Sequence, residues 1–227
     1  MSFNMSISEN LKKIKSKLPA DVTLVAVSKT KPIDSIMEAY NAGQRIFGEN
    51  KIQEMVEKHE QMPKDIQWHM IGHVQRNKVK YMAPFVSLIH GVENFKVLKE
   101  IDKQAKKYNR VIDCLLQIKI AEEDSKFGMN SLDAKTILES NELKDLNHIN
   151  IVGVMGMATF TEDTKQIEKE FKTLKNIFEE LKNIQSKNCH LKTISMGMSG
   201  DYDLAISCGS TMVRIGSSIF GERNYSH

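Results

Sequence analysis

The chain has 227 residues, 27% of them charged, and a formal net charge of +3 at pH 7. This length suits one large domain, and we expect a single domain over residues 1–227 with a sizeable buried core. The basic stretch 12–17 carries no interleaved aromatic residues, which argues against nucleic acid as a partner. No signal region opens the chain and no apolar run approaches the roughly 18 residues of a membrane helix, so we expect a cytoplasmic protein without membrane association.

The cysteines are odd in number, widely spaced and free of a Cys-x-x-Cys pattern: Cys114, Cys189 and Cys208. This pattern predicts reduced thiols rather than disulfides or a metal site. Cys114 falls within an apolar run, so we expect it to be a small core residue.

A predicted helix and a buried strand open the chain. The helix begins near Ser6 or Ser8 and repeats apolar residues at helical spacing. The unbroken apolar run 24–28 is typical of a parallel strand that helices cover on both faces. The next helix begins near Pro32 and stops at Gly43.

Strands and helices then alternate to the end of the chain, with no linker or shift in composition between them. Further strands are predicted at 45–50, 67–72, 87–92, 111–120, 149–159, 193–199 and 212–216. Helical patterns between them include 95–108, 131–143, 167–184 and 202–208. Eight such units predict an α/β fold, a single (β/α)8 TIM barrel with an extra N-terminal helix. A doubly wound open sheet is the alternative.

Polar residues follow the first two strands. Lys29 comes directly after the first, and Glu49 and Asn50 close the second. Ligands bind at the carboxyl ends of parallel strands, so an amine there is a candidate for imine formation with an aldehyde or ketone. The simpler interpretation is that Lys29 is the first solvated residue after a strand.

Glycine and serine follow the seventh and eighth strands, as Ser199-Gly200 and Gly216-Ser217-Ser218. In barrels these two loops frequently bind phosphate, because backbone N–H groups converge there on an anion. Each segment alone is typical of an ordinary turn. Together, across the barrel mouth from a lysine, they predict a site for a phosphate-bearing aldehyde.

Arg214 lies two residues before Gly216 and therefore faces the same side of the eighth strand. A guanidinium beside a pyridine nitrogen donates a hydrogen bond but does not readily supply a proton, which leaves the ring a weak electron sink. A buried ion pair with Glu222 is the alternative.

Histidine and methionine have mainly structural interpretations. His69 and His73 are four residues apart but have no third ligand nearby, so we expect no metal site. His69 is expected beside the pocket or in the core. Four methionines alternate along predicted strands and are expected to fill the barrel: Met155, Met157, Met196 and Met198.

Six segments carry specific motifs: 24–29 (Leu-Val-Ala-Val-Ser-Lys), 48–50 (Gly-Glu-Asn), 68–78 (Trp-His-Met-Ile-Gly-His-Val-Gln-Arg-Asn-Lys), 153–157 (Gly-Val-Met-Gly-Met), 195–201 (Ser-Met-Gly-Met-Ser-Gly-Asp) and 209–221 (Gly-Ser-Thr-Met-Val-Arg-Ile-Gly through Ile-Phe-Gly). In this order, over nearly the whole chain, they resemble the pyridoxal phosphate homeostasis protein family (YggS/PROSC).

The resemblance implies a barrel like the N-terminal domain of alanine racemase, with pyridoxal 5'-phosphate bound as an imine to Lys29. It implies that Arg214 meets the pyridine nitrogen and that Asn50 lines the pocket. The residues implied around the phosphate are Ser199, Gly200, Gly216 and Ser217. Met70 stands where the family often has phenylalanine, and Ser218 where a small apolar residue is common.

The function that the resemblance implies is pyridoxal phosphate homeostasis, in which the protein holds the cofactor and passes it to apo-enzymes without strong catalysis. A pyridoxal-phosphate-dependent amino-acid racemase is the alternative, and it needs an acid-base group on each face of the substrate carbon. Too few residues follow Gly221 for a second domain to supply one, although Tyr202 or Tyr225 could reach the mouth. A Schiff-base aldolase and a scaffold protein are further alternatives. We expect a monomer.

Overall fold

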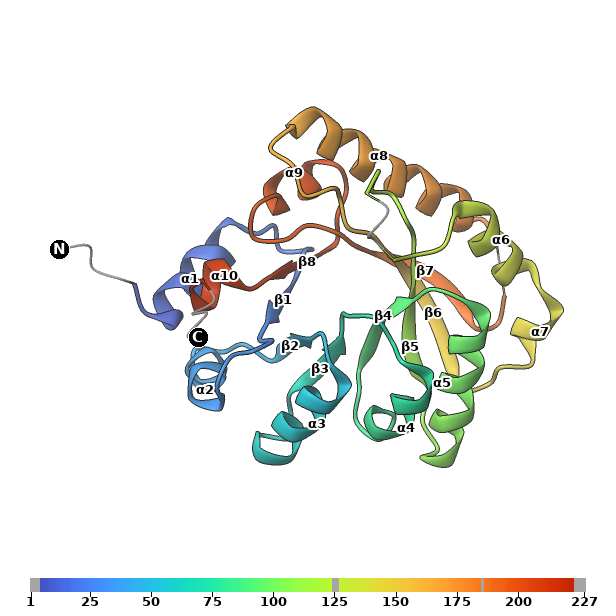
Figure 1. Cartoon of the computed structure of the whole chain (residues 1–227), viewed down its shortest axis with the longest axis horizontal. Coiled ribbons are helices and arrows are strands. Elements are labelled where there is room, and N and C mark those ends of the chain that lie inside the picture. The colour runs from blue at the N-terminus through green and yellow to red at the C-terminus, as the bar shows by residue number, and fades with distance from the viewer. Residues whose placement is uncertain (1–4, 124–126, 185, 223–227) are drawn as a thin grey trace.

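The computed structural model describes residues 5–123, 127–184 and 186–222. Eight parallel strands form a closed barrel in sequence order, from β1 (Thr23–Val27) round to β8 (Met212–Ile215), which pairs with β1. Figure 1 shows the helices around the outside of this ring. The closure confirms the predicted (β/α)8 barrel and excludes the open doubly wound sheet, in which the first and last strands would not pair.

The strands between β1 and β8 are β2 (Ile46–Glu49), β3 (Gln67–Met70), β4 (Leu88–Val92), β5 (Ile112–Gln117), β6 (Ile149–Met155) and β7 (Cys189–Ser195). The prediction for the seventh strand, 193–199, is wrong by several residues at both ends. Cys189 already pairs with Ile151 of β6, and Gly197 adopts a φ of +100°, a left-handed conformation that ends the extended strand.

The helices are α1 (Ile7–Lys17), α2 (Ile33–Asn41), α3 (Ile52–Gln61), the short 3-10 helix η1 (Arg76–Lys78), α4 (Val79–Met82), α5 (Phe95–Lys107), α6 (Ser131–Glu139), α7 (Asn141–Lys144), α8 (Thr164–Leu181), α9 (Tyr202–Ser207) and α10 (Ser217–Phe220). The predicted helix 131–143 is divided at Ser140, whose backbone is extended. Its hydroxyl accepts from the N–H of Leu143, so the serine ends one helix and caps the next.

The N-terminal helix α1 begins after Ser6, one of the two predicted starts. Ser6 and Glu9 form a capping box, in which each side chain accepts a hydrogen bond from the other residue's N–H. Leu11 and Ile14 are buried on the inner face of the helix. Asn10 donates to the carbonyl of Ile219, which ties α1 to α10.

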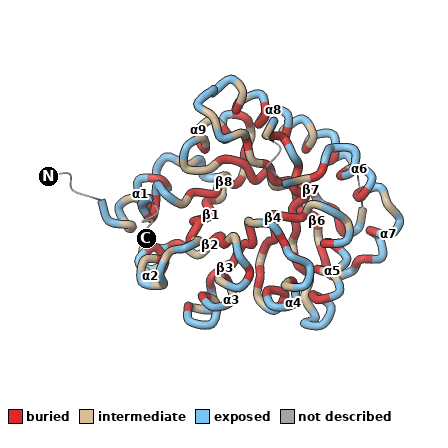
Figure 2. Tube along the Cα trace, in the orientation of Figure 1, coloured by how far each residue is buried: buried red, intermediate tan, exposed pale blue. Residues whose placement is uncertain are grey.

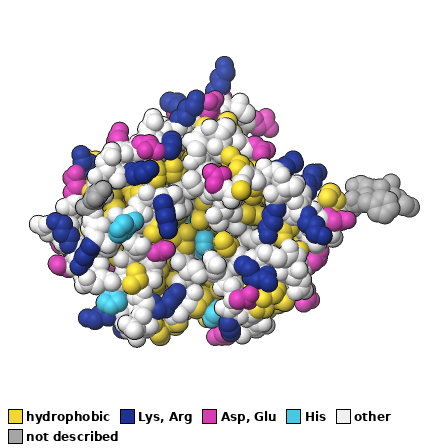
Figure 3. Space-filling view, turned by 180° about the vertical axis from the view of Figure 1, so that it is seen from behind, with side chains coloured by type: hydrophobic (Ala, Val, Ile, Leu, Met, Phe, Trp, Pro, Cys, Tyr) yellow, Lys and Arg dark blue, Asp and Glu magenta, His cyan; other side chains and the backbone are white. Residues whose placement is uncertain are grey.

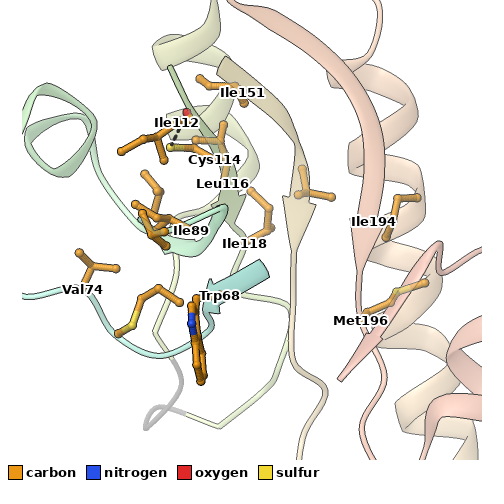
Figure 4. Close-up of a cluster of buried hydrophobic side chains, with 14 of the residues drawn as sticks. Trp68, Val74, Ile89, Ile112, Cys114, Leu116, Ile118, Ile151, Ile194 and Met196 are labelled. Atoms are coloured by element: carbon orange, nitrogen blue, oxygen red, sulfur yellow. Dashed lines mark hydrogen bonds between the residues drawn. The ribbon is translucent and has the colours of Figure 1, made fainter. Parts of the chain in front are cut away.

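Buried residues form two layers. A large outer cluster lies between the strands and the surrounding helices, and Figure 4 shows part of it, with Trp68, Ile89 and Leu116 among the labelled side chains. A smaller cluster contains Val25 and Leu115 and alternates with the outer one along the strands. Figure 2 shows the buried segments concentrated on the strand ring and on the helix sides that face it. The core is therefore the double layer that a filled barrel requires.

The expectation that four methionines fill the barrel is wrong for two of them, Met196 and Met198. Met155 belongs to the inner cluster, but Met196 belongs to the outer one. Met157 and Met198 lie beyond the ends of β6 and β7 and line a pocket, and Met157 also packs against the inner cluster. The early end of β7 moves Met198 from the interior to the barrel mouth.

All three cysteines are free and buried, and Cys114 lies in β5 within the outer cluster, as predicted. Burial raises the pKa of the Cys114 thiol, and the neighbouring Asp113 carboxylate raises it further. This thiol therefore stays protonated at neutral pH.

Charge is mixed over the surface drawn in Figure 3, where Lys and Arg side chains are interspersed with Asp and Glu side chains. Of the helices in the described part of the chain, none combines the length and the apolar composition that a bilayer crossing requires.

Candidate functional site

A cavity of about 680 Å³ lies at the carboxyl ends of the strands. Its volume falls within the range of small-molecule sites, roughly 300–1,000 Å³. Loops that follow seven of the eight strands contribute to its wall. All seven of the residues predicted from the sequence line it: Lys29, Asn50, Ser199, Gly200, Arg214, Gly216 and Ser217.

Lys29 and Lys31 come from the loop after β1, and both line the cavity. The Lys31 ammonium donates to the carbonyls of Phe220, Gly221 and Glu222, at 3.2, 3.0 and 3.2 Å. These bonds match the three protons of an ammonium group. Lys31 therefore anchors the segment after α10 to the β1 loop.

The loops after β7 and β8 meet at the hydroxyl of Ser199. Its Oγ lies 3.2 Å from the N of Gly216 and 3.4 Å from the N of Ser218, and it accepts from both. A Cβ added at Gly216 would lie 3.2 Å from both the Cβ and the carbonyl oxygen of Val27, whereas one at Gly200 would meet open space. Small residues, hydroxyls and backbone donors thus converge at this corner, a suitable chemistry for an oxyanion.

Arg214 is buried on β8 and reaches into the base of the cavity. Its Nη1 donates to Ser195 Oγ at 2.5 Å, and its Nη2 donates to the carbonyl of Gly156 at 3.2 Å. Arg214 therefore bonds to Ser195 and Gly156, and not to Glu222 as in the alternative considered from the sequence. Burial lowers the pKa of Arg214 to about 10, and Asp201 acts in the opposite direction, so the guanidinium stays charged at neutral pH.

A chain of buried side chains continues from Arg214 across the barrel. His90 Nδ1 lies 3.0 Å from Ser195 Oγ, and His90 Nε2 lies 3.0 Å from His69 Nδ1. Burial lowers the pKa of His69 to about 3. The pKa of His90 is also lowered, by burial first and then by His69 and Arg214. Both rings are therefore neutral, and one proton lies between them.

The neutral His69 ring makes stability sensitive to acid. The unfolded chain binds a proton at His69 near pH 6.5, whereas the folded chain resists it until about pH 3. We expect the free energy of unfolding to decrease as the pH is lowered through this window. His69 alone contributes roughly 1.4 kcal/mol per pH unit to this decrease. Urea unfolding between pH 7 and pH 4 measures the slope. The variant His69→Asn should have a shallower slope, and an unchanged slope would contradict the argument.

His73 follows His69 by four residues but has different neighbours. Its ring stacks on Phe127 with centroids 4.8 Å apart, and its Nδ1 lies 3.2 Å from Glu93 Oε1. Within residues 5–123, 127–184 and 186–222, no group of three or more His, Cys, Asp or Glu side chains is placed to hold a metal ion.

Glu49 is the strand-end residue that does not reach the cavity. It is fully buried, and its Oε1 accepts from Ser28 Oγ and from the Lys58 ammonium. Burial raises the pKa of Glu49 to about 7, against the opposing effect of Lys58 and Ser28. This cluster could not be predicted from the sequence, because Lys58 lies on the helix after β2, away from the strand ends.

Comparison with known proteins places this arrangement in a family. The model of the alanine racemase N-terminal domain matches residues 5–224. A pyridoxal phosphate homeostasis protein of Haemophilus influenzae is 37% identical over 98% of each chain. PipY of Synechococcus elongatus, solved with pyridoxal phosphate bound, is 33% identical and superposes with a TM-score of 0.86 over 95% of this chain and 100% of its own.

A more distant likeness is confined to the fold. Alanine racemase of E. faecalis is 17% identical, with a TM-score of 0.74, and the match covers 96% of this chain but 58% of the racemase. The near-complete coverage by the first two relatives, together with the domain model, determines the assignment. The chain belongs to the pyridoxal phosphate homeostasis protein family, which has the fold of the alanine racemase N-terminal domain.

Proposed function

We propose that the chain binds pyridoxal 5'-phosphate in the cavity, as an imine with Lys29, and keeps it in reserve for apo-enzymes that need it. The observation that carries the proposal is that three groups meet in one cavity of about 680 Å³. They are the amine of Lys29, the corner around Ser199 that suits an oxyanion, and the buried guanidinium of Arg214. PipY, a relative of this chain, has been solved with pyridoxal phosphate bound. When bound, the cofactor supplies an aldehyde that forms reversible imines with amines.

The residues present fit the cofactor from end to end. Ser199 and Gly216 would hold the phosphate through the hydroxyl and the backbone N–H that bond to each other in this structure, and Gly200 and Ser217 would complete the corner. Arg214 uses two of its five donors on Ser195 and Gly156, so others can meet the pyridine nitrogen. Asn50 lines the cavity from the carboxyl end of β2.

The chemistry at Arg214 favours storage over catalysis. Because the guanidinium keeps its proton, a pyridine ring that accepts its hydrogen bond would remain neutral and would accept electrons weakly. Racemisation also needs a second acid-base group. Tyr202 is buried and is not among the residues that line the cavity, and Tyr225 lies outside the described residues. We therefore propose a carrier that does not turn over alanine.

Release to another protein needs a surface that the acceptor can approach. Two aromatic side chains at the cavity rim are exposed, Phe127 by 54% and Phe160 by 91%. Exposed apolar groups beside a pocket are typical of contact sites for other proteins. We propose this rim as the face that meets an apo-enzyme.

The direct test is a titration of the purified chain with pyridoxal phosphate. We expect a visible absorption band from the imine, which borohydride reduction converts into a stable adduct on Lys29, found by peptide mass analysis. The loaded protein should restore activity to a pyridoxal-phosphate-dependent apo-enzyme and should not racemise alanine. A chain that gives no band refutes the binding proposal, and steady conversion of alanine would favour the racemase alternative.

A further inference from the structure

Lys29 lies in a turn that side chains from elsewhere hold on both sides. Before it, the carbonyl of Ser28 accepts from the Lys58 ammonium at 2.8 Å. After it, the N–H of Thr30 donates to Glu54 Oε1 at 2.6 Å. The two peptide groups that flank Lys29 are thus bonded to residues of α3.

The backbone at Thr30 explains why the turn needs support. Its φ is +62°, in the left-handed region, where a residue with a Cβ costs roughly 1–2 kcal/mol. Threonine is β-branched and especially unsuited to this conformation. Contacts that outweigh this cost determine the direction in which the preceding Lys29 leaves the backbone.

The supporting groups form a single cluster, in which Glu49 and Lys58 are buried and Glu54 is partly exposed. The Lys58 ammonium donates to Glu49 Oε1 and Glu54 Oε1, each at 2.7 Å, in addition to the Ser28 carbonyl. Ser28 Oγ donates to the same Glu49 oxygen at 2.5 Å. Lys58 is 6% exposed and Glu49 is fully buried. We call Glu49, Glu54 and Lys58 the turn clamp.

We propose that the turn clamp positions Lys29, so that its amine meets the aldehyde of pyridoxal phosphate in a reactive orientation. The inference rests on the proposed function. It makes Glu54 and Lys58 positioning residues, which act through the peptide groups of Ser28 and Thr30 and not by contact with the cofactor.

A purely stabilising role accounts less well for this arrangement. A buried ion pair is costly to desolvate, and hydrophobic residues of the same volume often stabilise a fold as well or better. Here the ammonium and the carboxylates also bond to the backbone of one strained turn, at Ser28 and Thr30. The geometry therefore points to control of this turn.

The test compares three variants on α3. Glu54→Ala removes the acceptor for the Thr30 N–H, whereas Glu54→Gln retains a carbonyl oxygen there. Glu57→Ala is the matched control, because Glu57 is exposed on the same helix and its carboxylate accepts from Gln53. Two quantities are measured for each: the rate constant of imine formation with pyridoxal phosphate, and the affinity for pyridoxine 5'-phosphate, which has no aldehyde.

We expect Glu54→Ala to slow imine formation by about tenfold, since small misplacements of a reacting group have effects of this size or larger. Its affinity for pyridoxine 5'-phosphate should stay within about twofold of the wild type, because the phosphate corner and Arg214 are untouched. Glu54→Gln should recover most of the rate, and Glu57→Ala should match the wild type in both measurements.

Two outcomes overturn the turn clamp as a positioning device. In one, Glu54→Ala and Glu57→Ala form the imine at the same rate. In the other, the rate and the affinity for the analogue fall together, which indicates a general loss of pocket shape. Failure of the proposed function has a different signature, because the wild type itself would then give no imine band.

Discussion

We expect the variant Lys29→Ala to show no imine band with pyridoxal phosphate, while Lys31→Met keeps the band of the wild type. Both lysines line the cavity and come from one loop, so the pair is closely matched. The Lys31 ammonium is committed to the carbonyls of Phe220, Gly221 and Glu222, so it would have to give up these three hydrogen bonds before it could attack an aldehyde. Visible absorption spectra of the three proteins, recorded side by side, measure the effect.

The reverse pattern would be decisive against this assignment. A band that survives in Lys29→Ala and disappears in Lys31→Met would make Lys31 the reactive amine. Retention of phosphate-dependent binding by Lys29→Ala, measured with pyridoxine 5'-phosphate, verifies that the variant pocket is still folded.

The variant Gly153→Ala should have the largest effect on stability. Gly153 pairs with Thr193 across β6 and β7, and a Cβ there would lie 1.9 Å from the Thr193 carbonyl oxygen. Neither strand can move away without breaking its own barrel pairing, so we expect a loss of about 3 kcal/mol or more in the free energy of unfolding. Urea unfolding followed by circular dichroism measures this loss.

Gly200→Ala is the control for that experiment. A Cβ at Gly200 meets no heavy atom within 4 Å, so the free energy of unfolding should change by less than about 0.5 kcal/mol. Equal stability of the two variants would show that the β6–β7 contact can relax, contrary to the expectation.

The fold and the cavity wall were predictable because both depend on local pattern. Apolar runs mark the strands, and in a parallel barrel every strand end reaches the same face. Lys29, Ser199 and Arg214 could therefore be grouped without any knowledge of which strands are neighbours. The same pattern wrongly extends β7 to residue 199, because it gives no sign that Gly197 adopts a left-handed backbone conformation.

The groups behind the cavity wall were not predictable, because they depend on pairings between distant segments. His90 is 21 residues from His69 and 105 residues from Ser195, and it looks like an ordinary residue of an apolar strand. Lys58 has the spacing of a solvated helix residue, yet it is buried against Glu49. Only the three-dimensional packing shows that these polar groups are hydrogen-bonded to one another.

The buried pair His69 and His90 also equips the barrel with an internal spectroscopic reporter. Both rings are buried, so we expect their ring N–H protons to exchange slowly with water and to give separate signals in proton NMR spectra. Because the hydrogen bonds run from His69 through His90 and Ser195 to Arg214, a ligand that draws on the guanidinium changes the electron density along the whole chain. We therefore expect ligand binding in the cavity to change the NMR signals of these histidine ring protons, so that binding can be measured without a label or an absorbing ligand.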